Sequence, residues 1–263
     1  MELRELGHTG VMLPEVGLGT WRYTGGVGPL RAAVELGAFH IDTAESYGTE
    51  EAVGEAIRGI RDRVFLATKV SPSHFRYRDV LRACDASLRR LRTDVIDLYQ
   101  LHWPNPRVPI EETMRAMEEL AEAGKVRFIG VSNFSVGEMR AAQAALRRHR
   151  IVSNQVLYNL VDRGIERDVL PFCQEQGVTI IAYSPLATGL SSLLRRDREG
   201  ALPRVAQETG RTVAQVALNW CLARPGVVTI PKANSVEHIR EDCGASGWRL
   251  SEAQRAALEG AFG

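Results

Sequence analysis

Short apolar runs and longer amphipathic segments follow one another along the chain in a regular rhythm. Eight of the apolar runs have the length expected of buried strands. They cover residues 16–20, 39–43, 64–70, 95–101, 128–132, 152–157, 179–184 and 227–230. Strands that are separated by helices in this way predict βαβ units and therefore a parallel sheet.

The segments between these runs carry apolar residues at helical spacing. In residues 110–123, Ile110, Met114, Met117 and Leu120 fall on one face, and Gly124 follows where a helix commonly ends. Further helices are predicted for residues 50–60, 136–149, 166–176, 212–223 and 251–262, the last with Ser251 as its capping residue. Loops are predicted for residues 159–164 and 187–192.

The number of strand–helix units indicates the architecture. Eight βα units in about 250 residues match a closed (β/α)₈ barrel, the TIM-barrel fold. Residues 3–6 and 11–13 flank a glycine-rich turn and predict a hairpin before the first unit. The alternative is an open, doubly wound sheet, which would be expected to carry a G-x-G-x-x-G turn after its first strand, and no such turn is present. No linker divides the chain, so residues 1–263 are predicted to form one domain.

Composition narrows the class of protein. The 263 residues include 33 Lys and Arg and 32 Asp and Glu, so the charge balance gives no support for a nucleic-acid or membrane-surface partner. No apolar run has the length of a membrane span, and the N-terminal residues lack the apolar core of a signal peptide. Four widely separated cysteines, Cys84, Cys173, Cys221 and Cys243, favour reduced thiols in a cytoplasmic protein. We expect no bound metal.

Polar and ionisable residues follow the predicted strands, where the carboxyl ends of barrel strands meet at one face. They are Asp42, Tyr47, Lys69, His102, Ser132, Asn133, Asn154, Gln155, Tyr183, Ser184 and Lys232. Each residue alone has a structural explanation, such as a buried ion pair or a helix cap. Together they bring acidic, basic and phenolic groups to one face, which predicts a catalytic site.

The motifs around these residues resemble those of the aldo-keto reductases over almost the whole chain. The matching blocks are Gly19-Thr20-Trp21, Ile41-Asp42-Thr43-Ala44-x-x-Tyr47-Gly48, Ala67-Thr68-Lys69, Leu101-His102-Trp103-Pro104, Gly130-Val131-Ser132-Asn133-Phe134, Asn154-Gln155, Ala182-Tyr183-Ser184-Pro185-Leu186 and Ile230-Pro231-Lys232. The resemblance implies a barrel whose bottom is closed by the N-terminal hairpin. It also implies carbonyl reduction by a nicotinamide cofactor.

The resemblance assigns four catalytic positions to Asp42, Tyr47, Lys69 and His102. The physical chemistry agrees, because a Lys69 ammonium beside Tyr47 would lower the pKa of the phenol. Asp42 would hold Lys69 in place, and Tyr47 would protonate the carbonyl oxygen. His102 would orient the carbonyl. Together with Trp21 and Trp103, Tyr47 and His102 are expected to line the substrate pocket.

The cofactor positions carry over from the resemblance in the same way. Ser132, Asn133 and Gln155 match the residues that hold the nicotinamide carboxamide, and Tyr183 matches the platform under the ring. The remaining predicted contacts run from the pyrophosphate to the adenine: Ser184, Leu186, Lys232, Ala233, Asn234, His238, Glu241 and Asp242, together with Thr20, Trp21 and Ile230. NADPH is the expected cofactor, with NADH possible.

Several positions depart from the family pattern. His238 stands where many NADP-preferring members have arginine, and Asp242 stands where asparagine is common. Residues 187–200 are predicted to be a short seventh loop, and residues 105–109 are a brief loop after Trp103. Short loops predict an open pocket of broad specificity.

Other functions fit part of the pattern. A Schiff-base aldolase could use Lys69 as its nucleophile, although it would not need the dinucleotide positions. A non-catalytic sensor that binds a nicotinamide cofactor is a further alternative. The sequence leaves the carbonyl substrate open among aldehydes, ketones, keto-sugars and diketo acids, and a monomer is weakly favoured.

Overall fold

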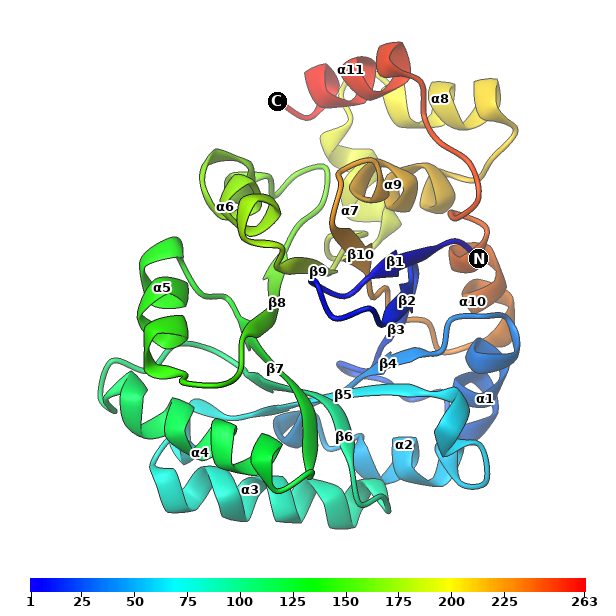
Figure 1. Ribbon diagram of the computed structural model, residues 1–263. Helices are drawn as coiled ribbons and strands as arrows, with labels where there is room; N and C mark the ends of the chain where they lie inside the picture. Colours follow the sequence, from blue (N-terminus) through cyan, green and yellow to red (C-terminus); the bar gives the residue numbers. More distant parts are fainter.

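The computed structural model describes all 263 residues and centres on eight parallel strands (Figure 1). Their order in the sheet is β10-β9-β8-β7-β6-β5-β4-β3. The strands are β3 (Leu18–Gly19), β4 (His40–Asp42), β5 (Phe65–Val70), β6 (Ile96–Leu101), β7 (Val126–Ser132), β8 (Ile151–Leu157), β9 (Thr179–Tyr183) and β10 (Val227–Thr229). Each lies in one of the eight predicted apolar runs, although β7 starts two residues and β8 one residue earlier than expected.

The sheet closes where its first and last strands meet. Val16, just before β3, forms a parallel bridge with Thr229 of β10. The Gly17 N–H donates to the Thr229 carbonyl at 2.8 Å, and the Thr229 N–H donates to the Glu15 carbonyl at 2.8 Å. The predicted (β/α)₈ barrel is therefore confirmed.

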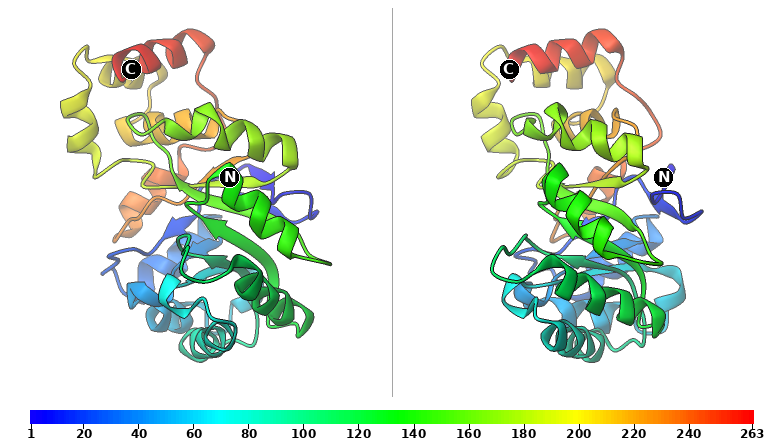
Figure 2. Two further views of the ribbon diagram at one scale, coloured as in Figure 1. Left: turned by 90° about the vertical axis from the view of Figure 1, so that its left-hand side faces the viewer. Right: turned by 60° about the vertical axis from the view of Figure 1, so that its left-hand side comes forward.

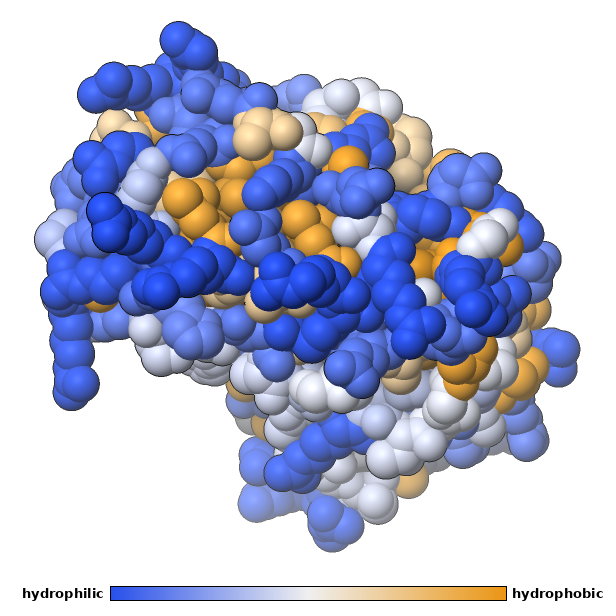
Figure 3. Space-filling model, turned by 90° about the horizontal axis from the view of Figure 1, so that it is seen from below, coloured by the Kyte–Doolittle hydropathy of each residue, from blue (hydrophilic) through white to orange (hydrophobic).

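Helices surround the barrel (Figure 1). They are α1 (Val27–Glu35), α2 (Glu50–Ile57), α3 (Tyr77–Leu91), α4 (Ile110–Glu122), α5 (Val136–Ala145), α6 (Val169–Gln176), α7 (Leu190–Arg196), α8 (Ala201–Thr209), α9 (Val213–Leu222), α10 (Val236–Cys243) and α11 (Glu252–Ala261). A cluster of 56 buried residues fills the space between them and the strands. Seen from below, on the side of α3 and α4, the surface is mainly hydrophilic, with apolar side chains in small groups (Figure 3). No helix is both long enough and apolar enough to cross a membrane.

The N-terminal hairpin, β1 (Leu3–Glu5) and β2 (Met12–Pro14), closes the bottom of the barrel as predicted. Leu6 and Leu13 are fully buried and pack with interior residues of five strands. Figure 2 shows the hairpin at the end of the barrel opposite the loops near residues 190 and 232. The hairpin thus covers one end of the barrel interior, and the carboxyl ends of the strands lie at the other end.

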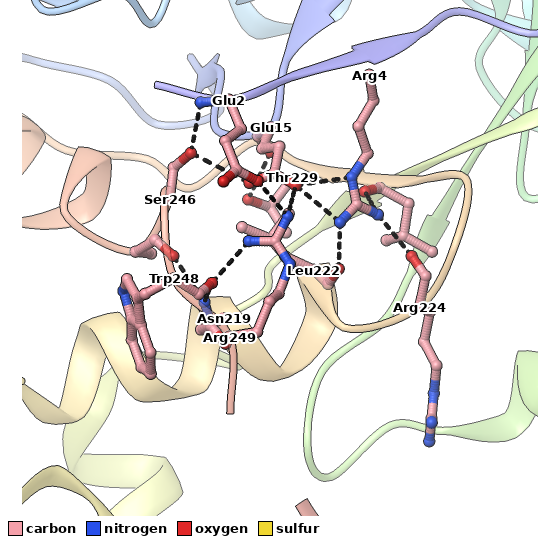
Figure 4. Close-up of polar contacts among 12 residues, drawn as sticks. Glu2, Arg4, Glu15, Asn219, Leu222, Arg224, Thr229, Ser246, Trp248 and Arg249 are labelled. Atoms are coloured by element: carbon pink, nitrogen blue, oxygen red, sulfur yellow. Dashed lines mark hydrogen bonds and ion pairs between the residues drawn. The ribbon is translucent and has the colours of Figure 1, made fainter. Parts of the chain in front are cut away.

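Two arginines fasten the hairpin to the C-terminal part of the chain (Figure 4). The Arg4 guanidinium donates to the carbonyl oxygens of Arg224 at 2.6 Å and Val227 at 2.9 Å, and also to that of Leu222. It pairs with Glu15, which is 1% exposed and is also contacted by Arg249. A buried carboxylate needs such partners, since an unpaired one would strongly destabilise the fold.

Four predicted elements differ from the structure by three residues or more. The helix predicted for residues 50–60 ends at Ile57. The helix predicted for residues 136–149 ends at Ala145, because one carboxylate oxygen of Glu118 accepts from the N–H groups of Arg147 and Arg148 and holds them outside the helix. The helix predicted for residues 166–176 starts at Val169, after a 3-10 turn and an Asp168 cap. The loop predicted for residues 187–192 is wrong from Leu190 onward, where α7 begins around the buried Leu193.

The other sequence expectations concern domains and thiols. The barrel, the hairpin and the outer helices share contiguous buried clusters, so we propose that residues 1–263 fold as a single domain. All four cysteines are free. Burial raises the pKa of the Cys84 thiol to about 12, which is consistent with a packing role.

Candidate active site

Asp42 and Lys69 meet inside the barrel at the ends of β4 and β5. The Lys69 Nζ atom lies 2.5 Å from Asp42 Oδ1 and 2.8 Å from the Thr43 carbonyl oxygen. Neither side chain is open to solvent. Burial lowers the pKa of Lys69, but Asp42 and Tyr47 raise it by more, so its net pKa lies above the ordinary value. Lys69 is therefore a fixed ammonium.

Tyr47 lies in a 3-10 turn (Glu45–Tyr47) that follows β4 directly. Its hydroxyl oxygen is 3.4 Å from Lys69 Nζ, and the ammonium lies 4.8 Å from the centre of the phenol ring. The prediction that the pKa of Tyr47 is lowered is wrong for the net shift. Burial raises this pKa, and the opposing effect of Lys69 is smaller. Tyr47 consequently keeps its proton at neutral pH.

His102 follows β6 and completes the group of four. Its Nε2 atom lies 3.3 Å from the Tyr47 hydroxyl oxygen, and its Nδ1 atom lies 3.4 Å from Ser46 Oγ. Burial, with a further contribution from Lys69, lowers the pKa of His102 to about 4. The imidazole is thus neutral at physiological pH and can offer one N–H donor and one acceptor. The structure brings all four predicted catalytic residues together.

The second carboxylate oxygen of Asp42 accepts from two glutamines. Gln155 Nε2 lies 2.8 Å from Asp42 Oδ2, and Gln100 Nε2 lies 3.2 Å from the same oxygen. Gln155 was predicted as a cofactor contact only, and Gln100 was not predicted at all. The signal for Gln100 was present, because it is a polar residue within an apolar strand run, two positions before His102.

Ser132, Asn133 and Tyr183 form a hydrogen-bonded row along the ends of β7 and β9. The Tyr183 hydroxyl donates to Asn133 Oδ1 at 3.0 Å, and Asn133 Nδ2 lies 3.0 Å from Ser132 Oγ. Ser132 Oγ donates to the Gln155 carbonyl at 2.9 Å. Asn133 has a φ of 63°, a left-handed conformation that asparagine tolerates better than most residues. The predicted carboxamide-binding and ring-platform residues are therefore neighbours.

The backbone after β9 has an unusual conformation. Ser184 and Ala187 have φ values of 48° and 54°, which is uncommon for residues other than glycine. Such strain gathers at ligand-binding sites. Leu186, between them, is half-buried and packs on the core. Two of the predicted pyrophosphate contacts therefore lie in a turn whose shape the surrounding fold imposes.

The predicted adenosine side lies between β10 and α10. Lys232 is exposed, whereas Ile230 and Ala233 are buried. The Thr24 N–H donates to Asn234 Oδ1 at 3.1 Å, which ties this segment to the loop after β3. Thr20, in contrast, is fully buried, and its hydroxyl donates to the Asp42 carbonyl at 3.0 Å.

His238 and Asp242, the two residues of α10 that differ from the family pattern, have different surroundings. His238 is exposed, and its N–H donates to the capping Ser235. Asp242 is buried, and burial together with neighbouring Glu241 raises its pKa to about 8. At neutral pH its carboxyl group is mainly protonated, so it presents both a donor and an acceptor, as an asparagine side chain also does. The substitution thus preserves much of the polarity of an asparagine.

Two tryptophans, Trp21 and Trp103, lie just after the carboxyl ends of β3 and β6. Trp21 is 53% exposed and Trp103 is 48% exposed, which is unusual for such large apolar side chains. Arg22 stacks on Trp21, 4.5 Å from the ring centre. Only residues 102–109 connect β6 and α4, which agrees with the brief loop predicted after Trp103.

Known proteins resemble this chain in both sequence and architecture. A family model described as "Aldo/keto reductase family" matches residues 15–261. The chain belongs to the aldo/keto reductase family. It is 42% identical to "Methylglyoxal reductase YeaE" of Escherichia coli (strain K12), an alignment that covers 96% of this chain and 92% of that protein.

Solved structures of aldo-keto reductases superpose on the whole barrel. The thermostable Tm1743, crystallised with the inhibitor epalrestat, has a TM-score of 0.92 and 44% identity, covering 99% of this chain and 100% of that one. An aldo/keto reductase from Klebsiella pneumoniae, in complex with NADP and acetate, has a TM-score of 0.86 and 42% identity, covering 98% of this chain and 94% of that one.

The donor set of this aldo/keto reductase fits a nicotinamide dinucleotide. Asn133 and Gln155 carry side-chain amides that would suit a carboxamide, and Tyr183 presents an aromatic ring at the same strand ends. Lys232 provides a cation after β10, on the side of the barrel where (β/α)₈ proteins commonly bind phosphate. Amides, an aromatic ring and a cation match the chemistry of carboxamide, nicotinamide ring and phosphate respectively.

Proposed function

We propose that the protein reduces aldehydes and ketones to alcohols, with NADPH as the hydride donor and Tyr47 as the proton donor. The observation that carries this proposal is the position of Lys69, which contacts Asp42 on one side and the Tyr47 hydroxyl on the other. Membership of the aldo/keto reductase family supports the reaction class. The Klebsiella pneumoniae relative in complex with NADP supports the cofactor.

Two donors can reach one carbonyl oxygen in this geometry. The Tyr47 hydroxyl and His102 Nε2 are 3.3 Å apart, so an oxygen that lies beside the pair, at the third corner of a triangle, can be within hydrogen-bond reach of both. Tyr47 keeps its proton because burial raises its pKa. The neutral His102 can then orient the carbonyl through an N–H on Nε2.

Proton transfer changes the charge at Tyr47. When bound, NADPH supplies the hydride that reduces the carbonyl carbon. The proton of the Tyr47 hydroxyl passes to the carbonyl oxygen, which leaves a phenolate. The Lys69 ammonium, held by Asp42, stabilises this phenolate without moving. The fixed ion pair therefore acts on the product side of the proton transfer.

Other residues at this face of the barrel indicate the cofactor and substrate preferences. Lys232 favours NADPH over NADH, because it can meet the additional phosphate, while His238 lacks the permanent charge of an arginine. The exposed Trp21 and Trp103 support an open pocket for small carbonyl compounds. The relative named methylglyoxal reductase supports 2-oxoaldehydes as first substrates to examine.

The aldolase alternative is disfavoured by the state of Lys69. A Schiff-base lysine must be a neutral amine to attack a carbonyl carbon. Here the net pKa of Lys69 is raised and its side chain is fully buried. Treatment of the protein and a carbonyl substrate with borohydride should accordingly leave Lys69 unmodified.

The deciding experiment is a screen for oxidation of NADPH and NADH over aldehydes, 2-oxoaldehydes, ketones, keto-sugars and diketo acids. We expect reduction of at least one small aldehyde, faster with NADPH. Binding of NADPH should be measured in parallel by fluorescence. A protein that binds NADPH but reduces no member of the panel would favour the sensor alternative and overturn the proposal.

A further inference from the structure

One row of neighbouring residues crosses four strands inside the barrel. Lys69 of β5 pairs with Gln100 of β6, Gln100 pairs with Gly130 of β7, and Gly130 pairs with Ser153 of β8. Residues paired across a parallel sheet point to the same face. Lys69, Gln100 and Ser153 have no exposed surface. Gln100 is thus held in the layer that contains Lys69.

The amide of Gln100 is directed at Asp42. Its Nε2 atom lies 3.2 Å from Asp42 Oδ2, while Lys69 occupies Oδ1. The carbonyl oxygen Oε1 of Gln100 is buried and has no hydrogen-bond partner. A reversed amide would place that oxygen against the carboxylate, so the charge of Asp42 fixes which end of the amide faces it.

Gly130 leaves the space that this side chain uses. A Cβ atom at Gly130 would lie 3.0 Å from Gln100 Cγ and 2.5 Å from Ser153 Oγ. Both approaches are closer than ordinary contacts between such atoms. Any residue other than glycine would therefore push Gln100 or Ser153 out of the layer.

Gln155 also donates to Asp42 Oδ2, at 2.8 Å, but it is expected to contact the carboxamide of the cofactor as well. Gln100 has no other polar partner. We propose that Gln100 is a positioning residue for carbonyl reduction: its amide fixes the Asp42 carboxylate, which in turn keeps Lys69 beside Tyr47. This inference rests on the proposed function and adds a residue that acts on the proton donor through two others.

The test compares Gln100→Met with Ser153→Ala. Gln100→Met keeps the length of the side chain and removes the amide. Ser153→Ala removes a buried polar group from the same row, and this group has no partner to lose. Displacement of a catalytic group can slow a reaction about a hundredfold. We expect Gln100→Met to lower kcat by about 10- to 100-fold, with KM and the Kd for NADPH unchanged, and Ser153→Ala to match the parent protein.

A double-mutant cycle shows whether Gln100 acts through Asp42. In an Asp42→Asn background the carboxylate is gone, so adding Gln100→Met should lower kcat little further. Gln100→Glu places an acceptor against Asp42 and should lower kcat more than Gln100→Met does. Gln100→Leu, with the same expected loss, replaces Gln100→Met if that variant does not fold.

Three outcomes would overturn the inference. They are a parent-like kcat for Gln100→Met, an equal loss in Ser153→Ala, and an undiminished effect of Gln100→Met in the Asp42→Asn background. Failure of the proposed function would look different, because the parent protein itself would then show no reduction with NADPH.

Discussion

Lys69 Nζ and Asp42 Oδ1 lie 2.5 Å apart in the interior of the barrel, with neither group exposed to solvent. A buried ion pair is balanced only while both partners are present, since removal of one partner leaves a desolvated charge. The same pair supports Tyr47. In the proposed mechanism, stability and proton transfer therefore both depend on the Lys69–Asp42 contact, and the two effects can be measured separately.

Lys69→Met should destabilise the fold and slow reduction. Loss of the ammonium leaves Asp42 as a buried carboxylate without a cation, which typically costs about 3–5 kcal/mol of unfolding free energy. Adding Asp42→Asn should recover part of this loss without recovering activity. Urea unfolding of the single and double variants, with reduction rates, tests both points. A single variant as stable as the parent would contradict this account.

Tyr47→Phe should abolish most of the reduction and leave cofactor binding intact. The ring remains, but the hydroxyl that we propose as the proton donor is lost. General acid catalysis commonly contributes about two to four orders of magnitude in rate. The measurements are aldehyde reduction and NADPH fluorescence titration. Near-parent activity would refute the role of Tyr47, and loss of NADPH binding would show that catalytic and cofactor contacts are not separate.

Lys232→Met should reduce the preference for NADPH over NADH. One charge-assisted contact contributes roughly 1.5–3 kcal/mol, so NADPH affinity should fall about ten- to a hundredfold. NADH affinity should change little, because NADH lacks the additional phosphate. Titration of both cofactors into both proteins decides the matter, and equal affinities in the parent would rule out this role of Lys232.

His40→Gln should weaken the pH dependence of the unfolding free energy on the acidic side. His40 is fully buried without a hydrogen-bond partner, and burial lowers its pKa to about 4, against the opposing effect of Asp42. Between about pH 4 and 6.5 the unfolded chain binds a proton there that the folded chain does not, so stability rises with pH across this window. The full effect is about 3 kcal/mol. Urea unfolding at pH 7 and pH 5 should show a smaller difference in the variant, and an equal difference would contradict the prediction.

Asp242→Asn should stabilise the protein at alkaline pH. The pKa of Asp242 is raised to about 8, so between about pH 4 and 8 the folded chain holds a proton that the unfolded chain releases. The parent therefore loses stability as pH rises through this window, and the variant does not. The variant's advantage should grow by a few kcal/mol from pH 5 to pH 9. A constant difference in unfolding free energy would show that Asp242 does not titrate in this way.

Strong local patterns explain what could be predicted from the sequence. The buried strands of a parallel barrel are continuous apolar runs, so all eight were visible. The four proposed catalytic residues lie at or just after strand ends, and barrel topology alone brings those ends together. Asp42, Tyr47, Lys69 and His102 could therefore be grouped before any distance was known.

The features that could not be predicted from the sequence depend on a balance of opposing effects or on contacts between segments that are distant in the chain. The sign of the Tyr47 pKa shift depends on whether burial or Lys69 is stronger, which requires coordinates. The early end of α5 depends on Glu118, a residue of α4 far away in the sequence. The contact of Gln100 with Asp42 depends on the space left by Gly130 on another strand. Such contacts leave no periodic signal in one segment.

The contacts of Arg4 have a consequence for folding during synthesis on the ribosome. Its partners include the Arg224 carbonyl, 220 residues later in the chain. At about 5–20 residues per second, a ribosome makes that stretch in roughly 10–45 s. Throughout this delay Leu6 and Leu13 have no finished interior to enter, and the edge of β3 has no partner. The N-terminal hairpin, which leaves the ribosome first, is thus among the last elements to reach its native contacts. In a nascent chain that stalls before β10 is made, the apolar side chains of the hairpin stay exposed to chaperones and proteases.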